Sequence, residues 1–285
     1  MRRPAHRRAT GGFTLIETVV VLLIFGIILA MAAALTRGVV ASQKRSLTAT
    51  RIAGVEAALV QFVQQQRRLP CPADGTTPAS NTSAGTEGAR NATGCTGNQQ
   101  DGVVPFRLLG LSESDVTDGW DRRLTFRIAP TLAADGRLDM SWCDPAGTEG
   151  DPAYPPVTQC NVTCVSTNLS NCTPPKTFLA TKGLEVRNIA GTVLMDPAAR
   201  TGAAYLLISH GETGGGARVA TGLLASSSLV DGTEEQKNYA NLALQAYYVD
   251  DSLVDTSGTG HFDDVVSRPS VMSIISKAGL GPRQH

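Results

Sequence analysis

An uncharged, mostly apolar segment from Thr18 through Thr36 constrains this chain more than any other feature of its sequence. As a helix, its 19 residues come close to the length that crosses a hydrocarbon core of about 30 Å. The residues before it include four arginines: Arg2, Arg3, Arg7 and Arg8. Because basic flanks stay cytoplasmic, the pattern predicts a single-pass membrane protein whose N-terminus is cytoplasmic and whose remainder lies outside.

A secretory signal peptide is the simplest alternative explanation of this segment. Ala30-Met31-Ala32 and Ala32-Ala33-Ala34 both have the small residues that signal peptidase needs. The apolar run, however, exceeds the usual signal core of roughly 7–15 residues. Glu17 also stands at its leading edge, where a carboxylate is costly and therefore functional by default. A plain one-span anchor is the other simple alternative.

The residues around Glu17, Gly11-Gly12-Phe13-Thr14-Leu15-Ile16-Glu17, resemble the signature of type IV prepilins and of the related pseudopilins of type II secretion. The resemblance implies cleavage between Gly12 and Phe13 by a membrane prepilin peptidase, which then methylates the new amine of Phe13. It also implies that Glu17 faces the N-terminus of a neighbouring subunit, since opposite charges in an apolar bundle are stable only as a pair. Residues 1–12 would then be a leader peptide, and residues 13–36 the transmembrane half of an N-terminal helix.

The helical pattern continues beyond the apolar segment, over residues 37–69. Apolar residues recur mostly at spacings of three to five, and polar residues occupy the other faces, which predicts an amphipathic helix. Its expected buried stripe consists of Leu47, Ile52, Val55, Leu59, Phe62 and Val63. Pro70 predicts an end near Leu69, because proline cannot continue a helix.

Residues 70–285 are predicted to form a globular, β-rich head with a cysteine-rich insertion at residues 143–175. Short β-type runs bounded by Gly, Asp and Pro indicate strands at Leu124–Ile128, Leu138–Cys143, Phe178–Ala180, Leu184–Ile189, Ala204–Ser209 and Leu244–Val249. Pro269 through Lys277 predicts a short helix. The fold class is therefore α+β, with the long helix packed on an antiparallel sheet, as in the pilin fold. Asp118-Gly119-Trp120 and the residues after it resemble the turn and strand that follow the helix in pseudopilins.

Charge gives little sign of a nucleic-acid partner. The whole chain has 25 basic and 25 acidic residues, and without residues 1–12 it would keep 21 basic and all 25 acidic residues. A mildly acidic chain lacks the basic footprint of a nucleic-acid-binding protein.

The six cysteines all follow the apolar segment: Cys71, Cys95, Cys143, Cys160, Cys164 and Cys172. An even number in an oxidising compartment suggests disulfides. Cys71 with Cys95 is the preferred local pair, because the two residues close the sides of a long polar loop. Zinc is the competing interpretation, but Cys160-x-x-x-Cys164 lacks a matching second pair or a nearby histidine.

The segment Ser209-His210-Gly211-Glu212-Thr213 raises two further hypotheses. It resembles the Arg-His-Gly-Glu-Thr run of histidine phosphatases, although Ser209 replaces the arginine that would hold phosphate. It also partly resembles the calcium loop of major pseudopilins, where later acidic residues complete the site. Oxygen ligands of this kind suit calcium, and the candidate ligands are Ser209, Glu212, Asp263 and Asp264. A solvated glycine-rich loop is the alternative to the metal site.

The resemblance as a whole implies a non-enzymatic filament subunit, either a minor pilin of a type IV pilus or a pseudopilin of type II secretion. Its expected partners are prepilin peptidase, other subunits, an inner-membrane assembly platform and membrane lipid. It would sit in the inner membrane with a periplasmic head before it enters a filament at the cell surface. A membrane-tethered binding module or adhesin is the alternative, and a tethered phosphatase is a remote one.

Overall fold

The computed structural model describes residues 15–141, 143, 175–225, 232–254 and 258–283, apart from the side chains of residues 30–37. The chain divides into two compact units, Met1–Gln43 and Lys44–His285. The second unit holds all the strands of the described chain and is called the head below.

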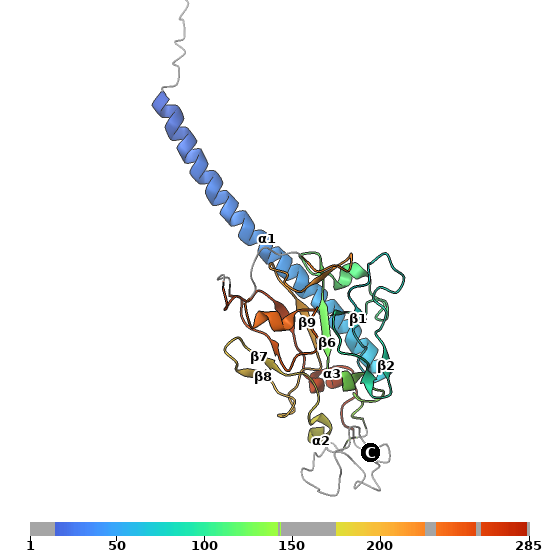
Figure 1. The fold of residues 1–285 in the computed structure, drawn as a ribbon. Coiled ribbons are helices and arrows are strands. Elements are labelled where there is room, and N and C mark those ends of the chain that lie inside the picture. Colours follow the sequence, from blue (N-terminus) through green and yellow to red (C-terminus); the bar gives the residue numbers. More distant parts are fainter. Residues whose placement is uncertain (1–14, 142, 144–174, 226–231, 255–257, 284–285) are drawn as a thin grey trace, which may run out of the picture. The chain divides into compact units, whose positions relative to one another are not determined.

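The longest element is helix α1, Leu15–Gln66 (Figure 1). It ends three residues before the predicted Leu69, because Arg67 takes a left-handed backbone conformation with φ of 55°. The Arg67 N–H still donates to the Val63 carbonyl at 2.7 Å, which closes the last turn. Among the helices of the described residues, none is both long enough and apolar enough to cross a membrane.

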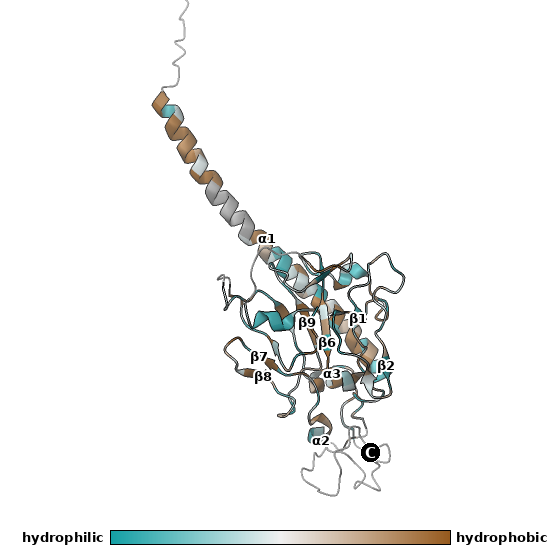
Figure 2. Cartoon of the chain, viewed as in Figure 1, coloured by the Kyte–Doolittle hydropathy of each residue, from teal (hydrophilic) through white to brown (hydrophobic). Residues whose placement is uncertain are grey.

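The head half of α1 buries one stripe, as the sequence predicts. Ile52, Val55, Leu59 and Val63 are buried. Leu47 is 43% exposed and Phe62 is only half-buried, outside the core, so the prediction was wrong for these two residues. Thr48 is buried in place of Leu47. In Figure 2 the described N-terminal residues of α1 are mostly hydrophobic, and the head half alternates between hydrophobic and hydrophilic residues.

The central element of the head is a five-stranded antiparallel sheet in the order β1-β4-β6-β9-β12. Its strands are β1 (Ala73–Asp74), β4 (Gly102–Val103), β6 (Thr125–Ile128), β9 (Tyr205–Ser209) and β12 (Val265–Ser267). The predicted strands at Leu124–Ile128 and Ala204–Ser209 are confirmed as β6 and β9. Both strands are buried along their whole length, which indicates that the sheet is covered on both faces.

Alternate side chains of β9 enter two different cores, as the pleat requires. Tyr205 and Leu207 pack in the core formed with α1 and the C-terminal helix α3, Val271–Lys277. Leu206 and Ile208 pack in a second core, over a smaller sheet formed by β11 (Tyr248–Val249), β7 (Val186–Arg187) and β8 (Val193–Met195). The head is therefore α+β with three layers: helices, the five-stranded sheet and a smaller sheet.

The remaining elements are short. They comprise β2 (Arg90–Asn91), β3 (Gly94–Cys95), β5 (Arg122–Arg123), β7 (Val186–Arg187), β8 (Val193–Met195), β10 (Arg218–Val219), β11 (Tyr248–Val249) and α2 (Pro175–Leu179), with single 3₁₀ turns at Glu113–Val116, Pro130–Ala133 and Glu235–Asn238. β2 pairs with β3 and β10 with β5. The β11–β7 pair is parallel, so the sheets are mostly rather than wholly antiparallel.

Two of the predicted strands are wrong. Leu138 and Met140 give their N–H groups to the carbonyls of Arg67 and Leu280, so this segment packs between helix ends instead of joining a sheet. Phe178 lies in α2, which begins at Pro175, a residue whose fixed φ suits the first helical position. The predicted strands at Leu184–Ile189 and Leu244–Val249 shrink to β7 and β11. The predicted C-terminal helix is confirmed as α3, with Ser270 as its N-cap.

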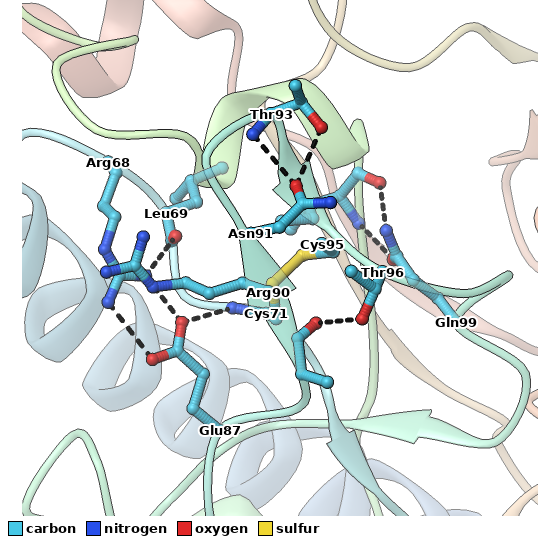
Figure 3. Close-up of a disulfide and its surroundings, with 12 residues drawn as sticks. Arg68, Leu69, Cys71, Glu87, Arg90, Asn91, Thr93, Cys95, Thr96 and Gln99 are labelled. Carbon is cyan, nitrogen blue, oxygen red and sulfur yellow. Dashed lines mark hydrogen bonds and ion pairs between the residues drawn. A yellow bond between two sulfur atoms is a disulfide. The ribbon is translucent and has the colours of Figure 1, made fainter.

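The Cys71–Cys95 disulfide is present as predicted. Beside it, Glu87 binds the Arg68 guanidinium through both carboxylate oxygens and accepts the Cys71 N–H at 3.0 Å (Figure 3). Cys143 is also disulfide-bonded, and Cys160, Cys164 and Cys172 lie outside the described residues. No cysteine in the described part of the chain is free.

Three arginines from β5 and β6 hold the loops of the head. Arg122, Arg123 and Arg127 together donate to nine backbone carbonyls, namely those of Gly75, Thr77, Gln99, Gly211, Glu212, Ala220, Tyr239, Ala240 and Leu242. Arg127 is fully buried. Because short strands pair few of their neighbours' carbonyls, these guanidinium groups supply the missing donors.

Lys182 leads to a prediction about stability and pH. Its ammonium is buried over the Phe178 ring, and burial together with the Arg137 charge lowers its pKa from 10.5 to about 6. Between these values the unfolded chain binds more protons than the folded one, so the free energy of unfolding should rise with pH across this window. Lys182→Met should flatten that rise, measured by urea unfolding of the detergent-solubilised chain at several pH values.

The matched control for this experiment is Lys176→Met, which removes an exposed lysine of α2. It should keep the parent slope. A Lys182→Met variant with the slope of the parent would show that Lys182 is not the titrating group.

Candidate functional site

The processing residues of the sequence motif can be placed only in part. Gly12 and Phe13 lie outside the described residues. Glu17 lies in the first turn of α1, exposed, and is the only charged residue between Leu15 and Leu29. A carboxylate is favourable there because the helix N-terminus carries a partial positive charge.

The first described turns of α1 present apolar side chains on every face. Twelve large apolar residues between Leu15 and Leu29 are at least 50% exposed. Seven of them are consecutive, from Val19 to Phe25, and seven residues complete nearly two turns. Soluble monomers rarely expose apolar patches of more than a few hundred Å². An exposed apolar surface of this kind is typical of sites that contact a membrane or another protein.

The head half of α1 has a second unusual surface. None of its exposed residues between Lys44 and Gln66 is charged, and most are small or are glutamine. The uncharged face consists of Ser46, Leu47, Ala49, Thr50, Ala53, Gly54, Ala57, Gln61, Gln64, Gln65 and Gln66. Small residues let two helix backbones approach closely.

Three of the four charged residues of this half contact the head instead, and the fourth, Arg45, is half-buried with its Nε lacking a hydrogen-bond partner. Arg51 donates to the carbonyls of Thr117 and Asp118 at 2.6 and 2.9 Å. Glu56 accepts a short hydrogen bond from the Ser267 hydroxyl of β12, and the Lys44 ammonium lies 5.9 Å from the Trp120 ring centroid. The outer face is thus uncharged because Lys44, Arg51 and Glu56 turn toward the head.

The turn at Asp118-Gly119-Trp120 docks the helix on the sheet. The Gly119 N–H donates to the Thr48 hydroxyl at 2.9 Å. A β-carbon at Gly119 would come within 2.4 Å of the Lys44 carbonyl oxygen, so only glycine allows this approach. The sequence resemblance identified this turn, and the structure shows what it contacts.

The Asp118 carboxylate ties the docking turn to the central sheet. It accepts the N–H groups of Trp120 and Arg122 at 2.9 and 3.0 Å, and the hydroxyl of Ser209, at the end of β9, at 2.6 Å. Burial raises the pKa of Asp118, and these donors oppose that rise. Ser209, a predicted calcium ligand, therefore has a structural partner here.

Of the other predicted calcium ligands, Asp263 contacts the turn Ser209–Thr213, which contains Glu212. Asp263 accepts the N–H groups of Glu212 and Thr213, each at 2.8 Å, and the Thr213 hydroxyl at 3.0 Å. Asp264 accepts the Asn238 amide at 2.8 Å, while the Glu212 side chain is exposed. Asp263 is thus brought to the Glu212 backbone, and a calcium site at these residues stays a prediction.

The residues of the described chain that are close enough to share a metal ion are a different set: Glu235, His261 and Asp263. Their ligand atoms lie within 4.8 Å of one another, and all three residues are buried. The Glu235 carboxylate already accepts hydrogen bonds from the Asp263 N–H at 2.6 Å and from the Gly232 N–H at 3.1 Å. It also lies 2.9 Å from His261 Nδ1. Burial raises the pKa of Glu235. Sequence reasoning missed Glu235, since it lies in a polar loop far from the acidic pair.

His210 does not resemble an enzymatic nucleophile. Its side chain is buried, and its Nε2 lies 2.8 Å from the Thr125 hydroxyl of β6. Burial lowers the pKa of His210 to about 3, which keeps the ring neutral. A phosphoryl donor would have to reach the buried His210 side chain, so the phosphatase hypothesis gains no support.

Comparison with known proteins gives a match to a family model. Residues 7–33 match the model of the prokaryotic N-terminal methylation motif. The chain therefore carries a prepilin methylation motif and is consistent with a type IV prepilin-like protein. No curated protein and no solved structure matches it.

Gly119 provides a stability test of helix docking. Gly119→Ala should lower the free energy of unfolding by about 1–3 kcal/mol, because the new methyl group collides with the backbone of α1 at Lys44. Gly54→Ala is the control. It lies on the same helix with nothing within 4 Å of its added carbon, and should raise stability by up to about 1 kcal/mol. Equal effects in denaturant unfolding would contradict the docking role of Gly119.

Proposed function

We propose that this chain is a structural subunit, a minor pilin or a pseudopilin, of a type IV pilus or a type II secretion filament. One observation carries the proposal: the methylation motif at residues 7–33 overlaps a helix whose apolar side chains are exposed on every face. A leader for prepilin peptidase and a helix that needs covering are the two requirements of such a subunit.

Maturation would begin with removal of residues 1–12 and methylation of Phe13 by prepilin peptidase. The apolar part of α1 would hold the processed subunit in the inner membrane, with the head in the periplasm. The Cys71–Cys95 disulfide supports an oxidising compartment for the head.

Assembly would then replace lipid around α1 with the helices of neighbouring subunits. The uncharged outer face of the head half supports this step, because close helix packing needs small residues and tolerates no unpaired charge. An inner-membrane platform driven by ATP hydrolysis elsewhere would extract the subunit. In the filament, Glu17 would face the Phe13 amine of a neighbouring subunit.

The cleavage site is tested by N-terminal mass spectrometry of the chain extracted from membranes. The mature protein should begin at N-methylated Phe13, since the resemblance of Gly11-Gly12-Phe13 to the prepilin signature implies a cut after Gly12. A mature chain that begins at Ala33 or Leu35 would instead assign it to signal peptidase.

Glu17 is tested by assembly. Glu17→Ala should still be cleaved and should still enter the membrane, because losing a charge makes the helix more apolar. It should be largely missing from sheared filaments, because the neighbouring amine loses its counter-charge. The measurement compares membrane and filament fractions at matched expression.

The control is Glu17→Asp, which keeps the carboxylate and should enter filaments better than the alanine variant. If Glu17→Ala enters filaments as well as the parent does, charge pairing is not the assembly mechanism of this subunit.

A further inference from the structure

Two exposed turns of the head carry the acceptor pattern for N-linked glycans, Asn-x-Ser/Thr. They are Asn81-Thr82-Ser83 and Asn91-Ala92-Thr93. All six residues are exposed, and both turns lie inside the loop closed by the Cys71–Cys95 disulfide. Five of the nine asparagines of the chain stand in this pattern; the other three, Asn161, Asn168 and Asn171, lie outside the described residues.

The two turns share one geometry. Asn91 Oδ1 accepts both the N–H and the hydroxyl of Thr93, at 2.9 and 2.7 Å (Figure 3). Asn81 Oδ1 accepts the same two groups of Ser83, at the same two distances. In each turn, the hydroxyl of the serine or threonine two residues later therefore orients the asparagine side chain by donating to its amide oxygen.

The turn itself does not require an amide. Asp74 and Asp139 make the same turn with the N–H and hydroxyl groups of Thr76 and Ser141. Only the oxygen is needed for it, so an aspartate would serve at either position. The amide nitrogen is what distinguishes Asn81 and Asn91 from these aspartates.

That nitrogen has no structural use at either position. Among the hydrogen bonds of the described residues, none involves Nδ2 of Asn81 or of Asn91. The buried Asn238 differs, because its Nδ2 donates to the Val249 carbonyl and to Asp264, both at 2.8 Å. An exposed asparagine with an oriented oxygen and an uncommitted nitrogen is the form that a glycosyl transferase can use.

We propose that Asn81 and Asn91 are acceptors of N-linked glycans, transferred from a lipid-diphosphate-linked sugar outside the cytoplasm. In the transfer, Nδ2 forms a bond to the anomeric carbon, and the bond from that carbon to the diphosphate oxygen breaks. Nδ2 loses one proton to a base of the transferase, and the lipid diphosphate leaves. The proposal goes beyond the filament role and depends only on export of the head.

The experiment is peptide mapping by mass spectrometry of the full chain purified from its natural cells. Peptides with Asn81 and Asn91 should carry sugar, and enzymatic cleavage of the glycosyl-amide bond should leave aspartate at both positions. Asn98 is the internal control. It is exposed and accepts the Gln100 N–H at 3.0 Å in a similar turn, but it lacks the hydroxyl and should stay unmodified.

Variants separate the acceptor from the turn. Ser83→Ala and Thr93→Ala should abolish modification at Asn81 and Asn91 respectively, and Thr93→Ser should retain it. Asn91→Asp should keep the parent unfolding midpoint while losing the sugar at that position. Unmodified asparagine at both positions in the mature chain would overturn the proposal, as would sugar that is linked to the Ser83 or Thr93 hydroxyl and released by base.

Discussion

Hydrogen bonds from three arginines to buried loop carbonyls are the interaction on which the head depends. Arg122, Arg123 and Arg127 come from two adjoining strands, β5 and β6, and reach loops from Gly75 to Leu242. Most strands here have only two or three residues, so regular pairing leaves many carbonyls without donors. A buried carbonyl without a donor costs about 1–3 kcal/mol. A guanidinium has five N–H donors in a rigid plane, which makes it suited to serve several loops at once.

Helix α1 performs two tasks with one sequence. Its inner stripe of Ile52, Val55, Leu59 and Val63 forms the core of the head. Its outer face carries no charge, because Arg51 and Glu56 bind the docking turn and β12. The contacts that attach the helix to the head are thus the same contacts that leave its outer face without charge. If the chain assembles as proposed, the same side chains would link docking of α1 to its packing in the filament.

Sequence patterns predicted the elements whose own residues decide their structure. β6 and β9 are short β-type runs, and α3 has its serine cap and a glycine, Gly279, just beyond its end. The patterns gave wrong predictions where contacts with residues far away in the sequence decide the local structure. Leu138 and Met140 look like strand residues, yet their N–H groups go to Arg67 and Leu280. The cluster of Glu235, His261 and Asp263 was predicted only in part, because no local sequence signal places Glu235 beside the other two residues.

By itself, the sequence determined the methylation motif, the apolar start of α1, the α+β class and the local Cys71–Cys95 pair. Each of these features depends on residue type and spacing within a short stretch of the chain. Local interactions are therefore enough to decide it. Only the tertiary structure decided that Ser209 binds Asp118, that Gly119 must lack a side chain, and that three arginines support the loops. These contacts join residues far apart in the chain, and their energies depend on burial, which no short stretch of sequence contains.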